Sequence, residues 1–244
     1  MKKIFVLLIG VLFFCSSWAQ KGKYDSVAVI ILDRMSDVIG DLESCSFKLN
    51  SSHDVVVSPY GLIKEFGDFD IFFSGPNKLM VNGRGHKGHR QLLYNGSRMA
   101  FYSYDENNYG LIDVEGSTLH LVDTVNENFG IEFPAIDFFY PTFTDDLMND
   151  CDSIKYLGME KFEGKEFFHI IGFGKDVTYQ FWINNDPYNL PGKYTITYRK
   201  QEGVPQFQAS FSDWQINPKL PDAMFDFKVP PNASRVRMMS KTDR

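Results

Sequence analysis

Five basic side chains crowd one glycine-rich stretch of an acidic sequence whose formal net charge is −6: Arg84, His86, Lys87, His89 and Arg90. Zinc needs three or four nitrogen, sulfur or carboxylate ligands, and two histidines three positions apart in a loop lack the rest of such a set. A P-loop lysine–serine pair between a strand and a helix does not follow either. We expect a solvated hairpin tip, or a contact with an anionic headgroup or a protein partner.

Other residues that could do chemistry have structural explanations. Asp145 and Asp146 are adjacent at the start of a short helical segment, where acids favour the helix dipole. His169 lies in an apolar strand segment and is expected to be a hydrogen-bonded sheet residue. The Gly-x-Ser-x-Gly nucleophile motif does not occur. The sequence therefore predicts no enzyme, no cofactor and no metal.

Composition narrows the class of protein further. The chain has 244 residues, 43% of them hydrophobic, including 23 Phe, 12 Tyr and 3 Trp. This apolar content excludes general disorder, and the acidic balance excludes a basic nucleic-acid footprint. An aromatic core is expected, and the question is what its rings pack against.

The first residues are typical of a secretory signal. Lys2 and Lys3 precede an apolar run over residues 4–14, and Ser17 and Ala19 provide small residues for cleavage. We expect residues 1–19 to be removed and residues 20–244 to form a single periplasmic domain without a transmembrane segment. Lipid attachment at Cys15 is disfavoured because a bulky Phe precedes it.

Cleavage would leave two cysteines, Cys45 and Cys151. In an oxidising compartment they could form a disulfide. They could equally be two buried free thiols on separate strands. Both interpretations stay open at this point.

Hydrophobic periodicity predicts one helix, a series of hairpins, a helical interlude and more hairpins. Residues 24–44 have a helical period, and alternation of period two follows from Cys45. Residues 116–150 break the strand rhythm with a helix at 118–129 and a short capped one after 143. Turns are predicted at 58–59, 67–68, 74–77, 82–83, 95–96 and 106–108, and later strands at 154–156, 165–173, 177–183, 194–199 and 206–214.

The alternation in the later strands predicts a curved antiparallel sheet with one polar and one aromatic-rich face. The helical segments could fill that aromatic face, or leave a cavity for an apolar ligand between sheet and lid. The candidate lining residues are Phe47, Leu49, Phe138, Phe139, Phe143, Phe167, Tyr179, Phe181, Tyr194, Ile196, Phe207 and Phe211.

Several motifs resemble the LolA/LolB-like lipoprotein-carrier superfamily: FWIN at 181–184 followed by LPGKY at 190–194, and the ending INPKLPDAMFDF at 216–227. More closely, the chain resembles a family of predicted periplasmic proteins of unknown function within that superfamily. The matching segments are 33–36, 72–78, 85–90 with 94–96, and 137–141.

The resemblance implies a mainly β, α+β fold: a half-open antiparallel barrel covered by an N-terminal helix and a central helical lid. It also implies affinity for a lipid or a lipoprotein acyl chain. We therefore expect a non-catalytic periplasmic protein that binds or carries such a chain. The alternative is an envelope sensing or scaffolding module, whose barrel is filled and whose partner is another envelope protein.

Overall fold

A computed structural model describes residues 22–133 and 135–241 of the chain. The predicted signal peptide, residues 1–19, lies outside them. Within this part of the chain, no helix combines the length and the apolar character needed to cross a bilayer.

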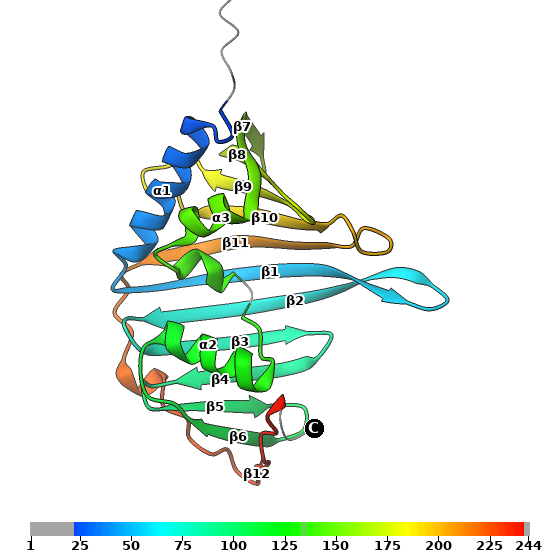
Figure 1. Ribbon diagram of the computed structural model, residues 1–244. Coiled ribbons are helices and arrows are strands. Elements are labelled where there is room, and N and C mark those ends of the chain that lie inside the picture. Colours follow the sequence, from blue (N-terminus) through cyan, green and yellow to red (C-terminus); the bar gives the residue numbers. More distant parts are fainter. Residues whose placement is uncertain (1–21, 134, 242–244) are drawn as a thin grey trace, which may run out of the picture.

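One twelve-stranded sheet forms the frame of the molecule (Figure 1). Its order is β12-β6-β5-β4-β3-β2-β1-β11-β10-β9-β8-β7, and every pair is antiparallel except β12 with β6. The sheet curves but does not close, because β7 and the β6–β12 pair remain as edges. The strands are β1 (Ser44–Val57), β2 (Gly61–Ser74), β3 (Lys78–Gly85), β4 (Gly88–Tyr94), β5 (Arg98–Ser103), β6 (Asn108–Asp113), β7 (Cys151–Phe162), β8 (Lys165–Gly174), β9 (Val177–Asn184), β10 (Pro191–Tyr198), β11 (Gln206–Ile216) and β12 (Ser234–Arg235).

The two series of hairpins join through β1 and β11. These strands pair from Cys45 opposite Ile216 to His53 opposite Phe207. The seam brings together the first strand and the last long strand of the chain. It places both series in one sheet with a shared apolar face.

The helices cover one face of this sheet, which we call the inner face (Figure 1). They are α1 (Ser26–Gly40), α2 (Thr118–Phe129) and α3 (Phe143–Asp150), together with the 3-10 turn η1 (Ile136–Phe139). A second 3-10 turn, η2 (Asp222–Met224), follows β11. Helix α1 packs against α3, η1 and β7, whereas α2 lies over β3 and β4.

Local signals explain where the helices begin and end. The Asp25 carboxylate accepts a hydrogen bond from the Val27 amide at 3.0 Å and caps α1. Ser117 caps α2 in the same way, and Gly130 ends it with a φ of 68°, a backbone conformation that glycine adopts at low cost.

The predicted fold class is confirmed: a curved, non-closed antiparallel sheet carries helices on one face. The helix predicted at 118–129 and the later strands are present, although β7 is longer than the predicted 154–156.

The turns predicted at 67–68 and 82–83 are wrong. Gly67 and Gly83 lie within β2 and β3 and flank the ring of Phe69, which a Cβ at either position would approach to 2.8 or 2.7 Å. These glycines make room for an aromatic ring and do not reverse the chain.

Candidate ligand-binding region

Most of the predicted cavity residues gather on the inner face beneath η1 and α3. Phe47, Leu49, Phe138, Phe143, Phe181, Tyr194 and Phe211 are buried in the core, and Phe139, Tyr179, Ile196 and Phe207 are partly buried against it. These residues come from β1, β9–β11, η1 and α3, which are distant in the sequence. The predicted lining residue Phe167 is also buried, but it lies on the other face of the sheet, opposite Asn184 and stacked on Phe162. Whether the predicted residues line a ligand cavity stays a prediction.

The rings in this region contact one another. Phe138 of η1 lies 4.9 Å from Phe143, 5.2 Å from Tyr194 and 5.6 Å from Phe211, measured between ring centroids. Phe139, beside it, stacks on Phe47 at 6.1 Å. The lid thus inserts two of its own rings between itself and the sheet. We call this set the aromatic cluster.

Burial in the cluster suppresses ionisation. Desolvation raises the pKa of Tyr179 to about 12 and that of Tyr194 further still. The Tyr140 hydroxyl, at the end of η1, donates to the Asp123 carboxylate of α2 at 2.5 Å. This hydrogen bond links the lid to the helix over the other half of the sheet.

Trp214 belongs to the aromatic cluster, although strand alternation places it on the other face. Its ring stacks on Phe47 at 4.2 Å. Asp213 has a φ of 55°, and the β1–β11 register shifts beside it. This bulge inserts one residue and turns Trp214 inward. Nothing in the sequence Ser-Asp-Trp at 212–214 indicates that the inward and outward positions of the strand change places here.

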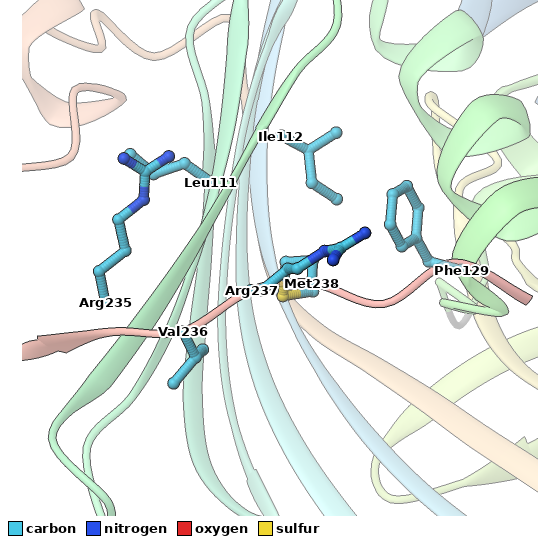
Figure 2. Close-up of a pocket in the computed structure, with 7 residues that line it drawn as sticks. All are labelled: Leu111, Ile112, Phe129, Arg235, Val236, Arg237 and Met238. Atoms are coloured by element: carbon cyan, nitrogen blue, oxygen red, sulfur yellow. The ribbon is translucent and has the colours of Figure 1, made fainter. Parts of the chain in front are cut away.

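A second region, at the β6 edge, contains a hollow that is open to solvent. It has a volume of about 460 Å³ and lies between β6, the end of α2 and the C-terminal segment. Figure 2 shows Ile112 and Phe129 facing each other, with the Arg237 side chain extending toward the space between them. The lining residues are Leu111, Ile112, Phe129, Arg235, Val236, Arg237 and Met238.

Sequence reasoning missed this pocket. Of its lining residues, Phe129 is the last residue of the helix predicted at 118–129. The alternation Arg235-Val236-Arg237-Met238 is a signal for an extended amphipathic segment. It does not say which part of the sheet that segment crosses.

The predicted basic stretch does not form one site. Arg84, His86 and Lys87 are exposed at the β3–β4 hairpin, and His86 faces the Glu65 carboxylate at 3.1 Å. The His89 ring stacks on Tyr104 at 3.9 Å and is hydrogen-bonded to Asn82.

Arg90 is the member of the stretch that faces inward. It alternates with the core residues Leu92 and Tyr94 along β4, and its guanidinium lies 5.7 Å from the Phe101 ring centre. Its Nε is buried without a hydrogen-bond partner. An anionic-headgroup or partner contact through these five residues stays a prediction.

The other chemical candidates are structural. His169 is hydrogen-bonded through one ring nitrogen to Gln180 and lies 2.8 Å from Glu160 through the other. The Asp146 carboxylate accepts from the Thr142 hydroxyl at 2.6 Å at the start of α3, which fits the expected capping position. Among the described side chains, no group of three His, Cys, Asp or Glu could hold a metal ion.

Cys45 and Cys151 are buried free thiols, so the structure shows the second of the two interpretations. Desolvation raises the pKa of Cys45 to about 12 and that of Cys151 to about 11. Both groups are therefore protonated and inert at neutral pH.

Comparison with known families gives one match over most of the chain. The model of a family described as "Predicted periplasmic protein (DUF2092)" matches residues 28–239. No curated protein matches.

Several solved structures are similar at low identity. The lipoprotein LppX of Mycobacterium tuberculosis is 14% identical with a TM-score of 0.49, over 81% of this chain and 98% of that chain. LprF of Mycobacterium bovis is 13% identical with a TM-score of 0.47, over 87% and 100%. The LolA superfamily protein NE2245 of Nitrosomonas europaea is 11% identical with a TM-score of 0.37, over 82% and 97%.

Proposed function

The chain belongs to the DUF2092 family of predicted periplasmic proteins, and from this premise we propose that it binds the apolar chain of a lipid or lipoprotein on the inner face of its sheet. Export by a cleavable signal over residues 1–19 and a role without catalysis are parts of the same proposal. The bound chain would lie between the sheet and the segments that cover it.

The observation that supports this proposal is the pocket of about 460 Å³ at the β6 edge. Its volume falls in the range of roughly 300–1,000 Å³ that is usual for small-molecule sites. Five of its lining residues, Leu111, Ile112, Phe129, Val236 and Met238, are apolar. Each buried methylene of a ligand contributes about 0.8 kcal/mol, against which the cost of ordering the chain must be set.

The aromatic cluster supplies a second place for the same ligand. Phe138 and Phe139 occupy the space between lid and sheet. An acyl chain could enter there only if η1 withdrew these two rings. Ligand contacts would then replace ring contacts, so binding would exchange one apolar packing for another.

Native mass spectrometry of the purified mature protein, followed by lipid extraction, tests the proposal. We expect a co-purifying lipid, or binding of members of an acyl panel added afterwards. If no lipid co-purifies and no member of the panel binds, the protein does not carry apolar chains.

One observation favours the alternative, an envelope sensing or scaffolding module. The β1–β2 hairpin projects from the body of the molecule (Figure 1) and carries exposed apolar side chains near its tip. Tyr60 is 79% exposed and Phe66 is 65% exposed. Such a surface is typical of a contact with another protein.

Crosslinking in cells distinguishes the two functions. A photo-crosslinker at position 60 should capture a defined envelope protein if the module binds a partner, and a Phe66→Ser variant should lose that product. Retention of lipid by the same Phe66→Ser variant would show that lipid binding does not depend on the hairpin.

A further inference from the structure

The C-terminal segment Ser234–Lys241, which we call the strap, forms one wall of the pocket at the β6 edge. Ser234 and Arg235 pair in parallel with Asn108 and Tyr109, and the Val236 amide donates to the Tyr109 carbonyl at 2.8 Å. Beyond this point the strap leaves β6 and crosses toward the end of α2 (Figure 2). The gap that opens between them is the pocket.

The strap is held at both ends of its crossing. Met238 packs over Gly110, where an added Cβ would collide with the Met238 sulfur. The Lys241 ammonium donates to the Asn126 carbonyl in the last turn of α2 at 2.7 Å, a favourable place for a cation. The pocket is therefore bounded by a defined segment on each side.

The charge of the pocket is opposite to that of the protein. Two of its seven lining residues are arginines, and none of those that the structure describes carries a carboxylate. The whole chain has a net charge of −6. Guanidinium groups present paired donors that match carboxylate and phosphate oxygens.

We propose that this pocket binds a single-chain amphiphile with an anionic headgroup, a carboxylate or a phosphate. The alkyl chain contacts Ile112, Phe129 and Met238, and the headgroup contacts Arg237, whose side chain extends toward them (Figure 2). Arg235 lies with Leu111 on the other side of β6. This inference rests on the proposed function, because it names the ligand class for the same inner face. We specify a ligand with a single alkyl chain because the pocket volume of about 460 Å³ lies in the lower half of the range usual for small-molecule sites.

The test compares four amphiphiles that share a dodecyl chain length and differ in the headgroup. Laurate, dodecyl phosphate, neutral monolaurin and dodecyltrimethylammonium are titrated below their critical micelle concentrations by calorimetry. We expect both anions to bind about tenfold more tightly than monolaurin, a difference of about 1.4 kcal/mol, and the cation to bind most weakly. The ratio of laurate to dodecyl phosphate distinguishes a fatty acid from a phosphate-headed lipid.

The variant Arg237→Gln should abolish the preference for anions and leave monolaurin binding unchanged. The matched control is Arg235→Gln, which removes the same charge from an exposed position on the other side of β6. It should keep the full preference. The advantage of the anions should also decrease with increasing salt, because exposed charge pairs are screened.

Two further variants locate the alkyl chain. Ile112→Trp, or Met238→Trp should the first fail to fold by circular dichroism, fills the pocket and should abolish binding of all four amphiphiles. Unchanged binding by a folded pocket-filling variant would place the chain elsewhere and overturn this assignment.

The outcomes separate the two proposals. Equal affinity for the four headgroups would overturn the anionic ligand class and leave apolar binding intact. Binding of none of them, together with no lipid in native mass spectrometry, would overturn both.

Discussion

The two halves of the inner face are covered in different ways. Over β7–β11 and β1, which we call the closed half, the cover is α1, η1 and α3, and the last two place phenylalanine rings against the sheet. Over β2–β6, the open half, the cover is α2 with its aliphatic residues Leu121, Val122 and Val125, and the strap. The open half retains a pocket of about 460 Å³. A cover that carries rings completes the core by itself, whereas an amphipathic helix and an extended strap leave space for another molecule.

The largest expected effect removes the ring at the centre of the closed half. Phe138→Ala should lower the free energy of unfolding by about 3–5 kcal/mol, because the ring loses its packing against Phe143, Tyr194 and Phe211. Urea denaturation measures this change. The control is Phe66→Ala, at a side chain that is 65% exposed, with an expected change within about 0.5 kcal/mol.

The same variant also tests whether the closed half is filled by the protein alone. If the closed half is a latent binding site, laurate should stabilise Phe138→Ala more than the unchanged protein. A loss of less than about 1 kcal/mol would show that the aromatic cluster does not complete the core.

The next largest effect is expected where β1 of the closed half meets β2 of the open half. The Asp54 carboxylate of β1 binds the Lys64 ammonium of β2 at 2.8 Å and the Gln206 amide of β11 at 2.9 Å. The Lys64 hydrogen bond, followed by that of Gln206, lowers the pKa of Asp54. Asp54→Asn should cost about 1 kcal/mol at neutral pH.

The cost should depend on pH with a definite sign. A carboxyl whose pKa is lowered by folding stabilises the protein above the ordinary pKa of the group, and this stability is lost as the pH falls through the lower, folded value. The difference between Asp54→Asn and the unchanged protein should therefore shrink in acid. A difference that is constant with pH would assign the effect to packing.

A smaller change in the free energy of unfolding is expected from a substitution in the open half. Gly110→Val would place side-chain atoms where Met238 packs, so the strap should lift from β6. We expect trypsin to cleave faster after Arg235 and Arg237, while the free energy of unfolding changes by about 1 kcal/mol or less. Gly40→Ala, where an added Cβ has no neighbour within 4 Å, should leave the rate of cleavage unchanged. Unchanged cleavage of Gly110→Val would mean that the strap does not depend on this contact.

The smallest effect is expected at two thiols of the closed half, which should not react while the protein is folded. Cys45 and Cys151 should resist maleimide at pH 8 in the folded protein, because desolvation raises the pKa of both thiols, to about 12 and about 11. Both should react after unfolding. Rapid labelling of the folded protein would show that water reaches this core, and no labelling of the unfolded protein without reductant would indicate a disulfide.

The thiols also give the opposite sign of pH dependence. Folding favours their protonated form, so their stabilising contribution is present below the ordinary thiol pKa and is lost as the pH rises toward the folded values.

The elements that were predicted well have local signals. Ser117 and Gly130 bound α2, and the strands of the later hairpins show the alternation of a sheet with one buried face. The same alternation places most of the twelve predicted cavity residues on one face of the sheet, and eight of the twelve are buried.

The features that were missed depend on contacts between distant segments. Gly67 and Gly83 resemble turn residues until the ring of Phe69 is placed across them. Trp214 changes face because of a bulge beside Asp213. The strap pairs with β6 through only two residues, and no pattern in the sequence predicts this pairing.

The pairing of β1 with β11 also sets an order of events during folding. A chain that emerges from its amino terminus can form hairpins β1 to β6 as they appear, because their contacts are local. The free side of β1 must wait until β11 has emerged, near the end of the chain. Such distant pairing slows folding and leaves an unpaired strand edge in the meantime. A chaperone that covers β1 during folding would act on an edge that later disappears into the sheet.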